Sequence, residues 1–219
     1  MDQGASQAGG GGDRQPAGLA LRVAVVGSPG SGKSTLSRRL AQACGIAALH
    51  LDDLYWRAGW QRPAEAEWRA HVTQLASGET WLIDGNYSPT LRERISRAQV
   101  VILVDTPMVV CLYRVVRRAL RIRAGRAAEL PARVRAQAEA GERVSATQDF
   151  AGLVRLVLSF RRRREEILSL VAEYAPALVV VGSRPRPADD IGRLVRQLRA
   201  LQAHSAGLTS RTARAGDGC

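Results

Sequence analysis

At 219 residues, 46% hydrophobic and with a formal net charge of +12, the chain has room for one domain and enough apolar side chains for its core. Its apolar runs fall short of the roughly 20 residues of a membrane helix, so we expect no membrane partner. A folded domain is expected over 19–203, between disordered tails at 1–18 and 204–219.

The cysteines and the placement of charge indicate the cellular compartment and the kind of ligand to expect. Cys44, Cys111 and Cys219 have no metal-ligand spacing and are expected to be reduced, which fits a cytoplasmic enzyme. Residues 106–164 hold fourteen arginines against four acidic residues. Such an excess attracts polyanions, either nucleic acid or the phosphates of bound nucleotides.

The first predicted strand, Leu21–Val26, runs directly into a glycine-rich segment that precedes a helix from about Lys33 to Cys44. The segment reads GSPGSGKS, which is the G-x-x-x-x-G-K-[ST] pattern of a phosphate-binding loop, the P-loop. Its glycines let successive N–H groups point at phosphate oxygens, and the helix N-terminus adds positive potential. An ordinary glycine-rich turn is the alternative, but the strand before it and the helix after it favour a nucleotide site.

Two residues of this loop have expected roles in binding a nucleoside triphosphate. The ammonium of Lys33, the only lysine beside 31 arginines, is expected to reach the β- and γ-phosphates. The Ser34 hydroxyl is expected to bind Mg²⁺. The predicted nucleotide-binding residues of the loop are Gly27, Ser28, Pro29, Gly30, Ser31, Gly32, Lys33, Ser34 and Thr35.

A second short strand, 46–51, leads to Asp52 and Asp53 and then to a loop rich in aromatic residues. Because ligands lie beyond the carboxyl ends of strands in open parallel sheets, both acids should lie near the P-loop. Either is a candidate general base if the phosphoryl acceptor is a hydroxyl. The aromatic residues from Tyr55 to Trp60 could stack on an acceptor or form a small local core. A helix is predicted over 63–76, and it carries Trp68 at a regular core position.

A third strand, 80–83, ends in Asp84, which is the position of a Walker-B acid that holds Mg²⁺. A simple Asp-Gly turn is the alternative. In the helix predicted over 90–98, Arg92 and Arg94 could hold an anion of the acceptor or form a solvated face.

The fourth strand, 100–104, precedes a long helix for which Thr106 is the expected N-cap. Arginines at i, i+3, i+4 and i+7 put four guanidinium groups on one face of this helix, either as a clamp on phosphates or as a solvated basic face. The predicted catalytic residues are Lys33, Asp52, Arg117, Arg118 and Arg121, with Arg114 completing the face.

Residues from about 121 to 150 show little apolar periodicity and are expected to form an irregular lid. A helix over 150–174 follows, and only one or two of its consecutive arginines Arg161–Arg164 can face the site. A fifth strand, 177–181, and a last helix over 188–202 complete the chain. Strands that alternate with helices specify a doubly wound α/β domain.

Several separated segments together resemble the bacterial adenylate-kinase-like P-loop proteins named DNA topology modulation proteins. They are GSPGSGKSTLSRRLA (27–41), HLDDLYWRAGW (50–60), WLIDGNY (81–87), DTPMVVCLYRVVRR (105–118) and FRRRREEIL (160–168). The resemblance implies a three-layer P-loop NTPase with a five-stranded parallel sheet in order 2-3-1-4-5, an arginine-rich lid after strand four, and ATP as phosphate donor. It also implies that the loop 182–186, with Arg184, borders the adenine. The turn DGNY differs from the D-G-[FY]-P-R turn of adenylate kinases, so the resemblance does not extend to AMP as acceptor.

The sequence therefore favours a kinase that transfers the ATP γ-phosphate to a small acceptor such as a nucleoside or nucleotide. The alternative is a nucleic-acid-associated ATPase linked to DNA topology, but no DNA-binding motif accompanies the basic charge. A GTPase-like switch is disfavoured because no N/T-K-x-D motif follows the fourth strand. We expect ATP and a small molecule as partners, and a monomer or homodimer.

Overall fold

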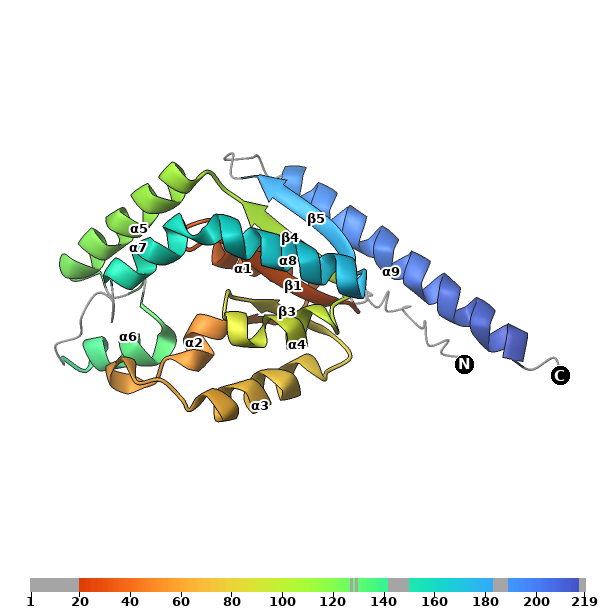
Figure 1. The fold of residues 1–219 in the computed structure, drawn as a ribbon, viewed down its shortest axis with the longest axis horizontal. Coiled ribbons are helices and arrows are strands. Elements are labelled where there is room, and N and C mark those ends of the chain that lie inside the picture. The colour runs from red at the N-terminus through yellow and green to blue at the C-terminus, as the bar shows by residue number, and fades with distance from the viewer. Residues whose placement is uncertain (1–19, 127, 129, 142–149, 183–188, 217–219) are drawn as a thin grey trace, which may run out of the picture.

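The computed structural model describes residues 20–126, 128, 130–141, 150–182 and 189–216 (Figure 1). The sheet has five parallel strands in the order β2-β3-β1-β4-β5, which confirms the predicted order. The strands are β1 Arg22–Gly27, β2 Ala48–His50, β3 Trp81–Asp84, β4 Val100–Asp105 and β5 Ala177–Gly182.

Helices cover both faces of this sheet and make three layers (Figure 1). One face carries α1 (Lys33–Cys44) and α9 (Asp189–Gly216), and the other carries α3 (Glu65–Ala76), α4 (Leu91–Ile95) and α8 (Phe160–Tyr174). The remaining elements lie at or near the carboxyl edge of the sheet. They are α2 Leu51–Tyr55, η1 Ala58–Trp60, η2 Ser88–Thr90, α5 Met108–Arg123, α6 Ala132–Glu139 and α7 Phe150–Leu158.

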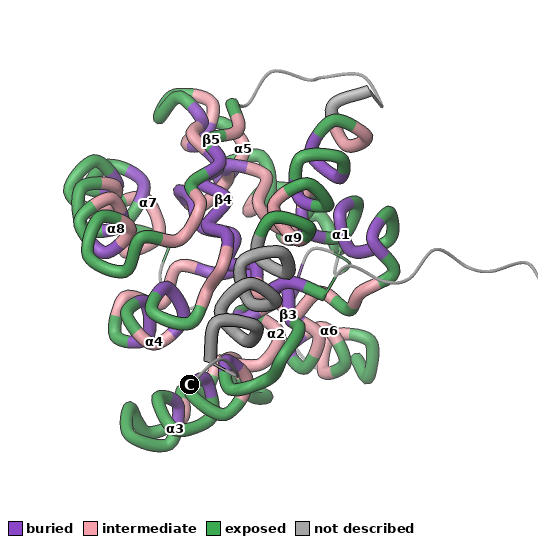
Figure 2. Tube along the Cα trace, turned by 90° about the vertical axis from the view of Figure 1, so that its right-hand side faces the viewer, coloured by how far each residue is buried: buried purple, intermediate pink, exposed green. Residues whose placement is uncertain are grey.

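The three central strands β1, β3 and β4 are mostly apolar because both of their faces are buried, whereas the edge strand β5 leaves Leu178 and Val180 exposed. In β1, Ala24 and Val26 point to the α3/α4/α8 side, while Val23 and Val25 point to the α1/α9 side. Successive strand residues alternate between two hydrophobic cores, as the period of two requires. Figure 2 shows these buried residues gathered along the strands in the middle of the molecule. The paired cores hold the strand ends, and therefore the loops of the carboxyl edge, in fixed positions.

The region expected to be an irregular lid contains a helix. Helix α6 occupies Ala132–Glu139, directly after Pro131, and α5 continues to Arg123. Only Val134 of α6 is buried, so its sequence lacks the apolar periodicity that would predict a helix. The prediction of irregular structure is wrong for these residues, and 142–149 lie outside the described residues.

Two other helix boundaries differ from the expectation. The helix predicted over 150–174 is divided at Ser159 into α7 and α8. Helix α9 does not end near Gln202 but continues to Gly216, so an unstructured tail from His204 is wrong for most of its length. The predicted tail at 1–18 falls outside the described part of the chain. Within that part, no helix combines the length and the apolar character that a membrane crossing needs.

Candidate active site

The P-loop lies between the end of β1 at Gly27 and the start of α1 at Lys33, and contacts with α5 hold its shape. Gly30 has a φ of 76°, and a Cβ atom there would lie 2.5 Å from the carbonyl oxygen of Cys111, so only glycine fits. Thr106 Oγ1 donates a hydrogen bond to the Ser31 carbonyl oxygen at 3.0 Å. Arg114 donates to the same oxygen at 3.2 Å and to that of Gly30 at 3.3 Å. Thr106 was expected as the N-cap of α5, but Pro107 holds that position and Thr106 binds the P-loop instead.

A second set of contacts ties the first glycine of the loop to β3 and α8. The Asn86 amide nitrogen donates to the Gly27 carbonyl oxygen, and its amide oxygen accepts from the Gly27 N–H at 3.2 Å. Arg163 of α8 donates in turn to the Asn86 carbonyl oxygen at 3.0 Å. Sequence reasoning missed Asn86 as a functional residue. The only signal was its place two residues after Asp84, in a segment shared with the resembling family.

The environment of Lys33 suits a phosphate ligand. Its ammonium group donates to the Ser28 carbonyl oxygen at 3.1 Å and is half-buried. Burial lowers the pKa of Lys33, and the nearby carboxylates of Asp52 and Asp84 oppose that shift. A desolvated ammonium gains more from an anion than an exposed one does.

Asp84 is buried at the carboxyl end of β3, beside Val25 of β1 and His50 of β2. Its Oδ2 atom lies 3.0 Å from His50 Nδ1. The hydrogen bond to Asp84 raises the pKa of His50, while burial opposes the shift. Asp84 therefore sits in the sheet itself rather than in an exposed turn.

The donor groups around the P-loop fit Mg²⁺ bound together with a nucleotide. Ser34, Asp52 and Asp84 all line one cavity. No cluster of three or more His, Cys, Asp or Glu side chains that could hold a metal ion occurs in the described ranges. Mg²⁺ usually takes one or two carboxylates and completes its shell with water and phosphate oxygens, so this small donor set suits it.

The cavity has a volume of about 1170 Å³ and brings together most of the predicted site residues. Those that line it are Pro29, Gly30, Ser31, Gly32, Lys33, Ser34, Thr35, Asp52, Asp84, Arg117 and Arg118. Gly27 and Ser28 stand behind the loop, where Gly27 binds Asn86 and Ser28 binds Lys33. Arg121 is not among the described residues that line the cavity. Arg184 lies outside the described residues.

Of the four consecutive arginines on α8, one faces the cavity. Arg163 lines it. Arg164 Nε lies 3.3 Å from Asp105 Oδ2, and Arg161 Nε lies 3.8 Å from Glu165 Oε1 on the same helix. Arg162 is exposed. This agrees with the expectation that a helix can present only one or two of the four to a ligand.

The two arginines predicted near the acceptor have other tasks. Arg94 is fully buried and donates to the carbonyl oxygens of Gly85 at 2.9 Å and Tyr87 at 3.2 Å. Burial lowers the pKa of Arg94 to about 10, against the charge of Asp84. Arg94 thus holds the loop after β3, which neither of its predicted roles described. Arg92 pairs with Glu173 at 2.5 Å on the molecular surface.

The aromatic residues divide between the core and the cavity. Trp68 of α3 is buried in the core. The ring of Tyr55 packs between those of Trp68 and Tyr87, with centroid distances of 5.0 Å to Trp68 and 4.3 Å to Tyr87. Trp56, Trp60 and Tyr87 line the cavity. The expectation of a small local core is confirmed for Trp68 and Tyr55, while contact of Trp56 and Trp60 with an acceptor stays a prediction.

The paired acids after β2 also divide. Asp52 lines the cavity, and its Oδ1 atom accepts a hydrogen bond from the Tyr87 hydroxyl at 3.0 Å. Burial raises the pKa of Tyr87, which keeps this hydroxyl protonated as a donor. Asp53 instead accepts from the N–H of Ala132, the first residue of α6, at 2.8 Å. Asp52 is thus the better placed of the two candidate bases, and Asp53 caps α6 from a distant segment.

We compared the chain with curated proteins, solved structures and protein-family models. No curated protein matches the chain. Among solved structures, shikimate kinase from Acinetobacter baumannii in complex with shikimate matches with a TM-score of 0.49 and 19% identity, over 82% of this chain and 93% of that one. A Chloroflexus aurantiacus protein described as a "putative kinase" matches with a TM-score of 0.47 and 14% identity, over 83% and 98%. Neither likeness bears on the substrate of this chain. The family model described as an AAA domain matches residues 23–149, more than half of the chain, and the chain therefore belongs to this AAA domain family.

Proposed function

We propose that the protein is an ATP-dependent phosphotransferase, a kinase that transfers the γ-phosphate to a small acceptor. The observation that carries the proposal is the convergence in one cavity of the P-loop, two carboxylates and several arginines from distant segments. At about 1170 Å³ the cavity exceeds the roughly 300–1,000 Å³ of a typical small-molecule site, which leaves room for a second ligand beside a nucleotide. We include in this proposal that the protein is related to the adenylate-kinase-like proteins named DNA topology modulation proteins, which its sequence resembles.

The residues of the cavity have distinct tasks in such a transfer. The P-loop N–H groups and Lys33 would bind the β- and γ-phosphates, and Ser34 and Asp84 would hold Mg²⁺, with Asp52 as a further, water-mediated partner where the acceptor is a phosphate and needs no base. The bound ion would neutralise phosphate charge. Arg117, Arg118 and Arg163, which line the same cavity, would stabilise the negative charge of the transferring phosphoryl group. In the same proposal Arg121, which does not line the cavity, adds a weaker and more distant charge to this clamp, and Arg184 borders the adenine.

The acceptor side needs a base only if the acceptor is a hydroxyl. Asp52 would then accept the hydroxyl proton, and the hydrogen bond from Tyr87 would keep its carboxylate pointed into the cavity. Tyr87 is a positioning residue in this scheme.

The test is ATP consumption measured with Mg²⁺ and, one at a time, nucleosides, nucleotides, sugar phosphates and DNA. A phosphotransferase should be stimulated by one small acceptor and should yield that acceptor in phosphorylated form. If ATP turnover is unchanged by every small molecule but rises with DNA, the phosphotransferase proposal is wrong.

The same measurement tests the nucleic-acid-associated ATPase linked to DNA topology, which the net charge of +12 favours. DNA-stimulated turnover should then fall steeply as salt rises, because phosphate contacts release counterions. We favour the kinase, because Arg114, Arg117, Arg118 and Arg163 line the cavity. ATP use and the free, buried Cys44 and Cys111 further lead us to propose a cytoplasmic location.

A further inference from the structure

The cavity extends on both sides of the P-loop along the carboxyl edge of the sheet. The P-loop follows β1, the middle strand of the order β2-β3-β1-β4-β5 (Figure 1). On the β5 side the cavity is lined by Val181, Gly182 and Ile191. On the β2 and β3 side it is lined by Asp52, Trp56, Trp60, Arg62 and Tyr87. If the adenine lies toward β5, as proposed above, the β2 and β3 side is left for the acceptor.

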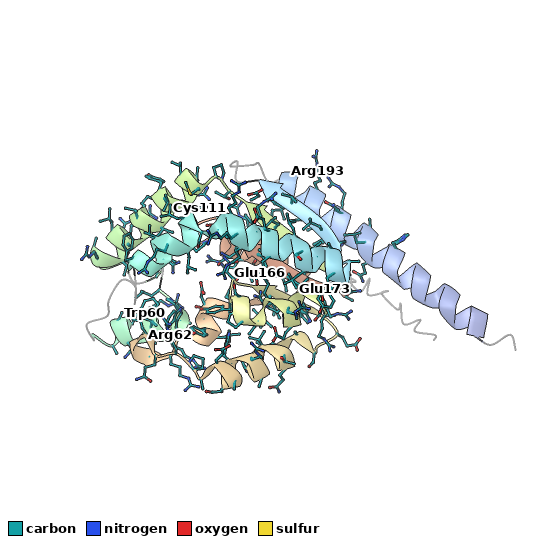
Figure 3. All side chains as sticks on the ribbon, in the orientation of Figure 1. Trp60, Arg62, Cys111, Glu166, Glu173 and Arg193 are labelled. Carbon is teal, nitrogen blue, oxygen red and sulfur yellow. The ribbon has the colours of Figure 1, made fainter. Side chains whose placement is uncertain are left out.

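The acceptor side offers flat apolar surfaces. Trp56 and Trp60 are half-buried, line the cavity and meet edge to face with ring centroids 5.2 Å apart. Figure 3 shows Trp60 and Arg62 on the segment that joins α2 to α3, beside α6. The Gly59 N–H donates to Gln137 of α6, so this aromatic segment is braced from outside. Indole rings held in this way present faces and edges to which a planar ring binds.

The same side also carries positive charge at the surface of the rings. The guanidinium carbon of Arg62 lies 5.5 Å from the centroid of the Trp56 ring, in a cation–π contact. Arg163 lines the cavity from α8, where its bond to Asn86 places it at the end of β3. Arg62 and Arg163 thus approach the acceptor side from two separate elements.

The charge of the whole cavity exceeds what a nucleotide needs. The described lining includes two acidic side chains, Asp52 and Asp84, and nine basic ones: Lys33, Arg38, Arg39, Arg62, Arg114, Arg117, Arg118, Arg155 and Arg163. An ATP molecule with one Mg²⁺ carries a net charge of only about −2, and a cleft of one sign concentrates ligands of the other. The excess therefore favours a second anion beside the nucleotide.

We propose that the acceptor is a molecule with a planar ring that carries its own anionic group, a phosphate or a carboxylate. Trp56 and Trp60 bind the ring and Arg62 binds the anion, while Arg163 serves the transferring phosphoryl group as proposed above. Arg62 is then the residue that sets the preference for a charged acceptor over a neutral one. This inference rests on the proposed phosphotransferase activity and names the class of its acceptor.

The test compares matched ligands that differ in one group. Each common nucleoside is paired with its 5′-monophosphate, phenol is paired with 3-hydroxybenzoate, and ribose 5-phosphate provides an anion without an aromatic ring. Dissociation constants are measured by titration calorimetry on the full chain, with and without ADP, and ATP consumption is measured in parallel. In at least one pair the anionic ring compound should bind at least about tenfold more tightly than its neutral partner, because charge-assisted hydrogen bonds are strong. If only the monophosphates gain, the anion is a phosphate, and if only 3-hydroxybenzoate gains, it is a carboxylate.

The variant Arg62→Gln should weaken binding of that anionic compound about tenfold and leave its neutral partner and the KM for ATP unchanged. Arg57→Gln is the matched control, because Arg57 lies in the same segment, is exposed and pairs with Glu67 instead of lining the cavity. Arg62→Lys should restore part of the lost affinity.

Three results would overturn the inference: equal binding of charged and neutral partners, binding of none of these compounds, or an equal loss in Arg57→Gln and Arg62→Gln. Failure of the proposed function looks different. Anionic ring compounds would then bind, but no compound would stimulate ATP consumption. Stimulation by a neutral acceptor alone would keep the kinase and reject the charged acceptor.

Discussion

At the scale of single residues, the P-loop contains one side chain, Lys33, whose charged group differs in shape from that of every arginine in the chain. Lys33 is the single lysine among 32 basic residues, and its ammonium lies in the loop against the Ser28 carbonyl oxygen. A guanidinium is a planar fork and an ammonium a compact point charge, so the arginine used everywhere else does not replace it.

Lys33→Ala and Lys33→Arg should both lower ATP turnover by at least about 100-fold while the thermal unfolding midpoint changes little. The physical reason is the loss of a point charge that contacts the phosphates, which is an interaction of the transition state rather than of the fold. ATP hydrolysis and a thermal melt measure the two effects separately. Native turnover in Lys33→Ala would reject the nucleotide site altogether.

His50 gives a prediction for pH. Its pKa is raised in the folded protein by the bond to Asp84, so its contribution to stability is fully present below the unfolded value of about 6.5 and is lost as pH rises through the folded pKa. The free energy of unfolding of the native protein, minus that of His50→Gln, should therefore be larger at pH 6 than at pH 9.

Urea unfolding at a series of pH values measures this difference. The exposed His71→Gln is the control for the removal of a histidine side chain elsewhere in the protein. A His50→Gln difference that grows toward high pH would show that the ion pair does not act as the geometry indicates.

At the scale of elements, contacts between distant segments place the loops of the carboxyl edge. Asn86 and Gly27 are 59 residues apart, and Arg163 and Asn86 are 77 residues apart, yet together they connect β1, β3 and α8 at the start of the P-loop. Asp53 and Ala132, 79 residues apart, join the segment after β2 to helix α6. The P-loop and the segment after β2 are therefore each braced by a helix from the second half of the chain.

Helix α6 should loosen when its cap is removed. Asp53→Ala leaves the Ala132 N–H without its carboxylate partner, and loss of such a cap costs about 1 kcal/mol. Hydrogen exchange should show faster exchange of the α6 amides and unchanged exchange in β1, β3 and β4.

Glu139→Ala serves as the control for α6, because Glu139 is exposed at the other end of the helix and pairs only loosely with Arg135, at 3.8 Å. Equal protection of α6 in Asp53→Ala and the native protein would show that the helix does not depend on this contact.

At the scale of the whole molecule, the net charge of +12 is concentrated in part around the cavity, while several surface arginines are balanced by carboxylates. Arg117 and Arg118 of α5 line the cavity with Arg163 of α8, and other arginines pair with Glu67, Asp105, Glu165 and Glu173. This arrangement makes the basic charge a property of the site as much as of the outer surface.

Two arginines of α5 differ in whether they line the cavity, which predicts a difference in kinetics. Arg118→Ala should lower kcat on the order of 10²- to 10³-fold, because Arg118 lines the cavity in which we propose the phosphates bind, while Arg121→Ala should lower it much less. Steady-state kinetics with the acceptor found in the panel measure both. Equal losses would mean that Arg121 enters the cavity when substrates bind.

Part of this molecule could be predicted from local patterns. The strands were recognised from apolar runs with turn residues at their ends, and the order of the sheet followed from the resemblance of several motifs. Prediction from local patterns fails for α6, because a helix with a single buried residue shows no apolar periodicity. It also fails at the end of α9, which continues beyond the predicted last residue. Thr106 is a residue type that often caps a helix, but its hydroxyl instead donates a hydrogen bond to the Ser31 carbonyl oxygen of the P-loop.

The sequence by itself predicted a phosphate-binding loop, because the P-loop pattern is formed by eight consecutive residues whose chemistry is local. Only the tertiary structure decided which other side chains line the same cavity. It selected Arg163 from four arginines, Asp52 from two acids, and Trp56 and Trp60 from the aromatic residues. The reason is physical: these side chains come from segments far apart in the chain, and which of them face one cavity depends on strand order, helix rotation and packing, which no short stretch of sequence encodes.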